Sequence, residues 1–299
     1  MNQREYSTRS SEHRPLDAIA DILAAAARLE SDGRGRLLAP QRLQSWPGIV
    51  HGGGLVALLD SAARAMGGAT GPWTVHGRLT ASVPTETALE LEGHEDHGTV
   101  ALTVLQDGQV VTSGAISPLD ARDDGAAWAG GGEGAELPMS DDCLACGALN
   151  PLGLQVRLRF DQDGVWAGLE PREAWREPDD RVHPALGPVL LDEVAWWLGA
   201  LTMKEGGLTN RISVTLLRPD APVGGPLIAA GRFERVTPVD RKPTFWRTET
   251  ALMAADGTLL ATASIVFRGG AEYSARQIAY FRPRTPPEIF CRMFPNHAR

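Results

Sequence analysis

An internal repeat is the feature that most restricts what this chain can fold into. Residues 46–66 read WPGIVHGGGLVALLDSAARAM, and residues 179–200 read DDRVHPALGPVLLDEVAWWLGA. In both segments Val-His opens an apolar run that reaches Leu-Leu-Asp. The His and the Asp are nine residues apart each time, and the two copies are 132 residues apart. Such self-similarity at a fixed offset indicates one structural unit that occurs twice in the chain.

The segments that follow the two copies also match in kind. Alternating apolar runs occupy 77–118 after the first copy and 210–267 after the second. An Asp-Gly pair, the strongest short signal for a β-hairpin, interrupts each segment. The two pairs are Asp107-Gly108 and Asp256-Gly257. Each half is therefore predicted to be one helix followed by an antiparallel strand meander.

The chain is expected to form two domains joined by a linker. Its 299 residues fit two domains of ordinary size. Residues 121–142 are rich in Gly, Ala and acidic residues, which predicts a flexible linker. The first domain then covers 1–120, with a leading helix at 17–30. The second covers 143–270, and 271–299 form a proline-rich, irregular tail.

Composition and charge exclude several classes of protein. The chain is 43% hydrophobic and 22% charged, as ordinary globular proteins are. Its net charge is −8 and it has no long Lys/Arg cluster, so nucleic acid is not an expected partner. No apolar run reaches the roughly 20 residues of a membrane helix, and three cysteines cannot form a disulfide framework. We expect a cytoplasmic protein that does not bind membranes.

The two repeated helices are apolar on almost every side, so each should be enclosed rather than laid on a surface. The predicted enclosure is a curled antiparallel sheet around each helix, an α+β arrangement with two sheets. An ionised carboxylate in such a helix is costly unless it is paired or hydrogen-bonded. This cost singles out three acidic residues: Asp60, Asp192 and Glu193.

The spacing shows that His51 cannot meet Asp60 on its own helix. Nine residues place the two side chains half a turn out of phase and about 13.5 Å apart along the axis. If the two helices pack antiparallel, however, the Asp of one approaches the N-terminal end of the other. That end has free backbone N–H groups and a positive dipole, which suit a developing oxyanion. A carboxylate facing such an end is the outline of an acyl-transfer site.

Two motifs resemble a known family. The pattern HGGGLVALLD, with Asp nine residues after His, resembles the helix signature of hotdog-fold acyl-CoA thioesterases of the phenylacetate-pathway type. The segment CLACGALNPLGLQVRLRF at 143–160 resembles the Cys-x-x-Cys-Gly-x-x-Asn-Pro-x-Gly-Leu opening of many hotdog thioesterase-like proteins. The resemblance covers most of residues 40–267. It implies a tandem double hotdog that hydrolyses an acyl-CoA or carrier-bound acyl thioester without a cofactor.

The resemblance also implies roles for particular residues. In the family a carboxylate on the central helix acts as nucleophile or general base, and the backbone N–H of the Gly after the His polarises the thioester carbonyl. Gly52 matches this Gly, His51 precedes it, and Asp60 and Asp192 match the carboxylate. In the second copy Pro184 takes the place of the Gly and has no N–H to donate. One working site is therefore predicted, between the start of the first helix and Asp192.

Four further residues complete the predicted site. Glu193 is the alternative carboxylate beside Asp192, and Gly53, at the same helix start as Gly52, is a candidate to contact the substrate. Trp196 and Trp197 are candidates to line an acyl pocket, although tryptophans of this kind are also common in protein cores.

Structural interpretations compete with these catalytic ones. His51 could simply cap its helix, and Asp60 could be a satisfied structural carboxylate. Cys143 and Cys146 could form half of a zinc site, but no second pair of ligands lies at a suitable spacing. No metal is therefore predicted, and the resemblance implies that the two cysteines belong to a turn before a strand.

Two other functions stay open. A related hotdog enzyme of secondary metabolism could perform dehydration or cyclisation, although the usual Asp-x-Asn-Pro-x-His signature of hydratases is absent, because Asn150-Pro151 continues as Leu-Gly-Leu. A non-catalytic acyl-binding protein is the other alternative, since Pro184 indicates decay of one site. The chain supplies both halves of a site, so a monomer suffices, and a homodimer formed by sheet pairing is the alternative assembly.

Overall fold

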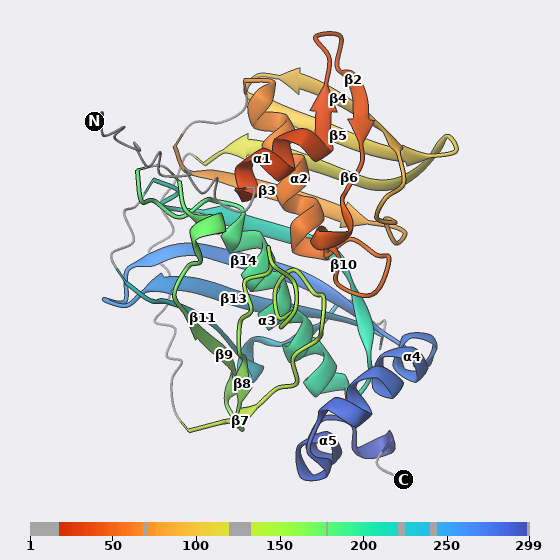
Figure 1. Cartoon of the computed structure of the whole chain (residues 1–299), viewed down its shortest axis with the longest axis vertical. Helices are drawn as coiled ribbons and strands as arrows, with labels where there is room; N and C mark the ends of the chain where they lie inside the picture. Colours follow the sequence, from red (N-terminus) through yellow and green to blue (C-terminus); the bar gives the residue numbers. More distant parts are fainter. Residues whose placement is uncertain are drawn as a thin grey trace, which may run out of the picture.

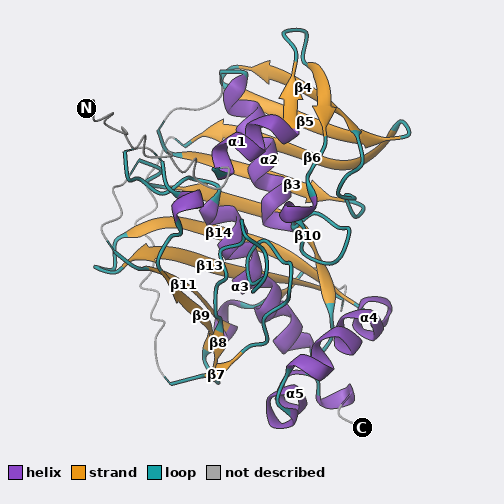
Figure 2. Ribbon diagram, viewed as in Figure 1, coloured by secondary structure: helices purple, strands orange, loops and turns teal. Residues whose placement is uncertain are grey.

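The computed structural model places two long helices on one face of a large antiparallel sheet (Figures 1 and 2). The residues that it describes are 18–67, 71–119, 133–177, 179–220, 225–239 and 244–297. Within them, no helix combines the length and the apolarity that crossing a membrane requires.

The two repeated sequence segments form the long helices α2 (Gly52–Ala65) and α3 (Leu186–Met203). Helix α2 begins after His51, whose ring accepts a hydrogen bond from the Gly54 N–H. Helix α3 ends at Lys204, which adopts the left-handed conformation with φ 59°. Both helices bury most of their residues, as expected for segments that are apolar on nearly all sides.

The strands of each half follow the same plan. The first half contains β1 (Ala27–Leu29), β2 (Arg34–Leu37), β3 (Trp73–Leu79), β4 (Leu89–Asp96), β5 (Thr99–Gln106) and β6 (Gln109–Pro118). The second contains β7 (Ala135–Glu136), β8 (Arg159–Phe160), β9 (Gly164–Leu169), β10 (Gly207–Leu216), β11 (Leu227–Arg232), β12 (Thr237–Pro238), β13 (Phe245–Ala254) and β14 (Leu259–Gly269). In each half the strand after the long helix pairs with the last strand, β3 with β6 and β10 with β14.

The two halves share a single sheet, which corrects the prediction of two separate sheets. Strands β3 and β10 pair antiparallel, with Val75 opposite Val214, and join the halves edge to edge. Each of these strands would otherwise leave a row of backbone N–H and C=O groups unpaired, and the pairing satisfies both rows at once. The resulting order is β1-β2-β4-β5-β6-β3-β10-β14-β13-β11-β9-β8-β7, with β12 beside β13.

Both Asp-Gly pairs lie in hairpin turns, as predicted. Asp107 and Gly108 have φ values of 52° and 73° and connect Gln106 directly to its partner Gln109. Positive φ at both central residues is the mark of a type I′ turn. In the second half Gly257, with φ 85°, lies in the turn that the Ala254 N–H closes on the Thr258 carbonyl at 2.9 Å.

Three flanking segments differ from the predictions. The leading helix α1 (Ile19–Ala26) ends early, because Ala27–Leu29 pair as strand β1. Residues 121–132 of the predicted flexible linker lie outside the described residues, but in its remaining part Ala135–Glu136 form β7 and Leu137 is buried. The predicted irregular tail is helical instead.

The tail forms α4 (Ala271–Phe281) and α5 (Pro287–Met293). Helix α4 buries Ile278 and Phe281 along one side. Pro287 stands at the first position of α5, where a missing N–H costs nothing. The prolines of the tail therefore separate short helices rather than prevent them.

Helices α2 and α3 meet closely near their N-terminal ends and from there run in opposite directions (Figure 1). A Cβ atom added to Gly53 would lie 2.2 Å from the carbonyl oxygen of Pro188. Only glycine therefore allows this approach.

Gly53→Ala should destabilise the protein by about 1–3 kcal/mol, because the helices must separate to admit the methyl group. Gly225→Ala is the matched control, since a Cβ at Gly225 meets nothing within 4 Å. The control should change the free energy of unfolding by less than about 0.5 kcal/mol. Urea unfolding of both variants measures this, and equal stabilities for the two would contradict the close approach.

Asp60 is a buried carboxylate on α2 whose oxygens are both engaged within the first half. Oδ1 accepts a 2.7 Å hydrogen bond from Trp73 Nε1, and Oδ2 lies 3.2 Å from Arg64 Nε. Burial nevertheless raises the pKa of Asp60 from 3.8 to about 6, against the opposing effects of Arg64 and Trp73.

This pKa predicts a pH-dependent stability that Asp60→Asn removes. Between pH 3.8 and about 6 the folded state binds more protons than the unfolded state, so stability falls as the pH rises through this window. The free energy of unfolding of the wild type minus that of Asp60→Asn should fall by about 2–3 kcal/mol from pH 4 to pH 7. Urea titrations at both pH values measure the difference, and an increase with pH would refute the assignment.

Candidate functional site

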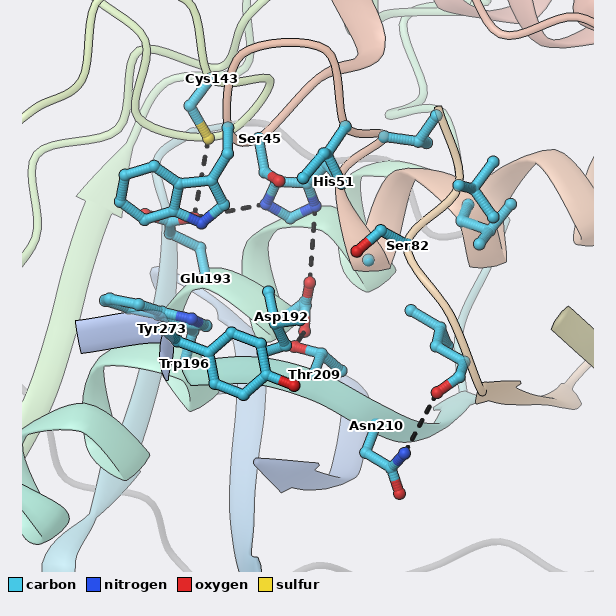
Figure 3. A pocket seen from close by; sticks show the side chains of 18 of the residues that line it. Ser45, His51, Ser82, Cys143, Asp192, Glu193, Trp196, Thr209, Asn210 and Tyr273 are labelled. Atoms are coloured by element: carbon cyan, nitrogen blue, oxygen red, sulfur yellow. Dashed lines mark hydrogen bonds and ion pairs between the residues drawn. The ribbon is translucent and has the colours of Figure 1, made fainter. Parts of the chain in front are cut away.

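A cavity of about 220 Å³ lies where the two halves meet (Figure 3). Its walls come from the start of α2 and the loop before it, the segment that follows β3, the loop around Cys143, the middle of α3, the start of β10, and α4. The apolar part of the lining includes Leu55, Trp196 and Phe281, and the polar part includes His51, Asp192 and Glu193. The structure thus brings most of the predicted site residues to one place.

His51 lies between two carboxylates from α3. Its Nδ1 is 3.5 Å from Asp192 Oδ2, and its Nε2 is 3.3 Å from Glu193 Oε2. Nδ1 also lies 3.4 Å from the Gly54 backbone nitrogen, so the ring caps α2 as well. Burial lowers the pKa of His51, but hydrogen bonds with Cys143 and Glu193 outweigh this effect and raise the pKa well above 6.5.

Asp192 is held at the start of the opposite helix. Its Oδ2 accepts a 2.8 Å hydrogen bond from the Gly53 N–H, and its Oδ1 accepts a 2.7 Å hydrogen bond from the Thr209 hydroxyl. Burial raises the pKa of Asp192, while the charge of His51 and the two hydrogen bonds oppose this rise. Gly53, predicted to contact substrate, instead donates its N–H to Asp192.

Gly52, at the start of α2, keeps a backbone N–H without a hydrogen-bond partner among the described residues. The residue also lines the cavity. A Cβ at this position would lie 2.7 Å from Asp192 Oδ2. Glycine is therefore needed here for the Asp192 carboxylate to lie so close to the start of α2.

Glu193 and Cys143 form a second buried pair in the same cavity. Cys143 Sγ lies 3.8 Å from Glu193 Oε2. Despite the opposing effect of burial, the hydrogen bond from Cys146 lowers the pKa of Cys143 to about 7. Burial raises the pKa of Glu193, but the hydrogen bond with His51 outweighs this effect and lowers the pKa of this carboxyl.

The pocket at the start of α3, which the repeat makes equivalent to the cavity at the start of α2, is much smaller. The pocket beside His183 and Pro184 measures about 40 Å³, and Asp60 is not among its lining residues in the described chain. The ring of His183 accepts a 3.1 Å hydrogen bond from the Ala185 N–H. Burial, together with the charge of Arg64, lowers the pKa of His183 to about 3. The two copies of the repeat thus differ in space and charge as well as in sequence.

The two predicted tryptophans lie in different environments. Trp196 lines the cavity, and its Nε1 donates to the Gly207 carbonyl oxygen over 2.9 Å. Trp197 is 1% exposed and packs in the core, outside the lining. Helical geometry places consecutive residues about 100° apart, so only one of the pair faces the cavity.

Two of the residues that contact the site carboxylates were not among the predicted site residues. Thr209 reaches Asp192 from β10, and Cys143 reaches Glu193 from the loop before β8. The Cys-x-x-Cys motif singled out Cys143 in the sequence, but it gave no indication that Cys143 would contact Glu193. Thr209 had no signal, because its approach to Asp192 depends on where β10 begins beside α3.

Comparison with known proteins identifies the fold. Neither family models nor curated protein sequences match the chain. Solved structures match over nearly their whole lengths. An acyl-CoA thioesterase II from Mycobacterium marinum superposes with a TM-score of 0.59 at 15% identity, covering 86% of this chain and 100% of that one. A protein of unknown function described as having a hot dog fold, from Alicyclobacillus acidocaldarius, gives 0.53 at 17% identity, with 83% and 98% covered.

A third match has a different described activity. The dehydratase domain of RzxB from Pseudomonas fluorescens superposes with a TM-score of 0.55 at 16% identity, covering 82% of this chain and 98% of that domain. At such low identity these similarities establish the fold and leave the reaction to be argued from the site. The chain has a hotdog fold, as its sequence motifs predicted.

Proposed function

We propose that the cavity binds an acyl thioester and hydrolyses it, with one working site in each chain. The observation that carries the proposal is the position of the Asp192 carboxylate beside the free N–H of Gly52, inside a cavity whose remaining walls are mostly apolar. The Asp192 carboxylate can activate water, and the Gly52 N–H can hold a developing oxyanion. The matching thioesterases support this choice of reaction.

The chemistry follows from these two groups. With the thioester carbonyl oxygen at the Gly52 N–H, Asp192 takes a proton from water as the water oxygen bonds to the carbonyl carbon. The tetrahedral intermediate then breaks its C–S bond, and the proton held by Asp192 passes to the departing thiolate. The products are a carboxylic acid and a thiol. The hydrogen bonds from Gly53 and Thr209 keep the carboxylate oriented during these steps.

The thiol carrier is proposed to be coenzyme A. The net charge of −8 does not favour docking of a carrier protein, since carrier proteins are usually acidic. The M. marinum structure, described as an acyl-CoA thioesterase, supports the same choice. The lining residues Leu55, Trp196 and Phe281 would then enclose the acyl group.

Asp192→Asn should lower kcat/KM for acyl-CoA hydrolysis by at least about 100-fold, because the amide cannot accept the proton from water. Asp60→Asn is the matched control and should stay within about threefold of the wild type, since Asp60 lies outside the cavity. Chromatographic measurement of free CoA over a panel of acyl chain lengths provides the rates. Full turnover by Asp192→Asn together with loss in Asp60→Asn would refute the proposal.

A second candidate reaction is dehydration of a 3-hydroxyacyl thioester. Its supporting observation is the 3.5 Å approach of His51 Nδ1 to Asp192 Oδ2, which provides two acid–base groups from opposite halves in one cavity. The RzxB dehydratase domain supports it as well. A 3-hydroxyacyl-CoA probe separates the reactions, because hydrolysis releases CoA whereas dehydration produces a conjugated enoyl thioester. Thermal stabilisation by the probe without either product would identify a non-catalytic binding protein.

A further inference from the structure

Three side chains with metal-binding atoms meet at the inner wall of the cavity. His51 precedes α2, Cys143 lies in the loop before β8, and Glu193 belongs to α3. All three residues are buried, and their nitrogen, sulfur and oxygen atoms lie within 4.8 Å of one another. In Figure 3, dashed lines run from the Cys143 thiol and from the His51 ring to a common point, which is the Glu193 carboxylate that both contact.

We propose that His51 Nε2, Cys143 Sγ and Glu193 Oε2 bind one zinc ion, whose fourth coordination position faces the cavity. The sequence motif pointed to Cys143 and Cys146 as half of a zinc site, with Cys291 and His297 as the other candidates. The fold adds an imidazole and a carboxylate from segments far away in the chain. The proposal concerns metal binding and does not depend on the reaction proposed above.

The two distances that join Glu193 Oε2 to the other ligand atoms suit a tetrahedral ion. Zinc binds His nitrogen, carboxylate oxygen and Cys sulfur at about 2.0–2.3 Å. Tetrahedral angles then place the oxygen about 3.3 Å from the nitrogen and about 3.5 Å from the sulfur. The corresponding distances in the structure are 3.3 Å and 3.8 Å. The carboxylate therefore lies at a suitable distance from both other ligands, and zinc would displace the protons of the ring and the thiol on binding.

The charge of the cluster also favours a cation. Two carboxylates, Asp192 and Glu193, and the Cys143 thiol surround a single imidazole in a buried place. Arg268, which also lines the cavity, forms an ion pair with Glu272. Buried negative charge is costly unless it is paired, and a divalent ion would supply the compensating charge.

The surroundings of the ligands resemble those of a prepared metal site. The other ring nitrogen of His51 lies 3.5 Å from Asp192, an arrangement that directs Nε2 toward a metal. The Ala145 N–H donates to Cys143 Sγ over 3.3 Å, as a ligating thiolate requires. Ser140 Oγ accepts from the Cys143 N–H over 3.0 Å and fixes the loop.

The mixed ligand set indicates zinc rather than another common ion. Magnesium and calcium prefer oxygen ligands alone, whereas a thiolate, an imidazole and a carboxylate together suit zinc. Three protein ligands with one open position are also the arrangement of zinc ions that bind water or substrate. All three ligands line the cavity, so water or a carbonyl oxygen could reach the fourth position.

The test uses the full chain without a polyhistidine tag. After dialysis against metal-free buffer and then micromolar zinc, mass spectrometry of the metal content should find about one zinc per chain, and Cys143→Ser and Glu193→Gln should each bind at least about 100-fold more weakly. Cys291→Ser is the matched control, because Cys291 is exposed and lies outside the cluster. It should bind zinc as the wild type does.

A second measurement needs no variant. Zinc should slow alkylation of Cys143 in the chelator-treated wild type by at least about tenfold, while labelling of Cys291 stays unchanged. Absence of zinc binding by the wild type, or zinc binding that Cys143→Ser does not weaken, would overturn the proposal. Because neither measurement uses a substrate, failure here would leave thioester hydrolysis untouched.

Discussion

At the crossing of α2 and α3, the Gly53 N–H donates to the Asp192 carboxylate over 2.8 Å. Hydrogen bonds to charged groups contribute about 1.5–3 kcal/mol, and a buried carboxylate without them is strongly destabilising. The bond forms only because the backbone of Gly53 can approach α3 so closely. This contact holds the two halves in register, and it also fixes a carboxylate beside the free N–H of Gly52. The packing of the fold and the geometry of the cavity thus depend on the same few atoms.

The two copies of the repeat perform unequal tasks in this arrangement. The first copy supplies a helix start with backbone donors, and the second supplies Asp192 and Glu193. At the opposite helix start, Pro184 has no N–H and the pocket is about 40 Å³. Asp60, the counterpart of Asp192 in the first copy, is held by Trp73 and Arg64. When one of two duplicated cavities is sufficient, the residues of the second cavity can pack into the core instead. The pairing of Asp60 with Arg64 is consistent with this loss of the second cavity.

Local patterns were enough to predict the central elements. The repeat predicted α2 and α3, the Asp-Gly pairs predicted the turns, and the His-to-Asp spacing predicted that Asp192 approaches the other helix. Features that depend on distant segments could not be read in this way. Pairing of β3 with β10 is decided by which sheet edges meet. The position of Cys143 depends on the path of a whole loop, and α4 depends on an apolar surface that only the folded molecule presents.

The identity of the groups around His51 links the proposed metal site to the choice of reaction. Hydrolysis requires a carboxylate and an N–H donor, and neither of these is a nitrogen of the ring. Dehydration would require one nitrogen of His51 to take up or release a proton. A ring whose Nε2 is bound to zinc and whose Nδ1 is held between Asp192 and the Gly54 N–H has no nitrogen left for that task. Zinc in this cavity would therefore favour thioester hydrolysis over dehydration on chemical grounds, independently of any similarity to other proteins.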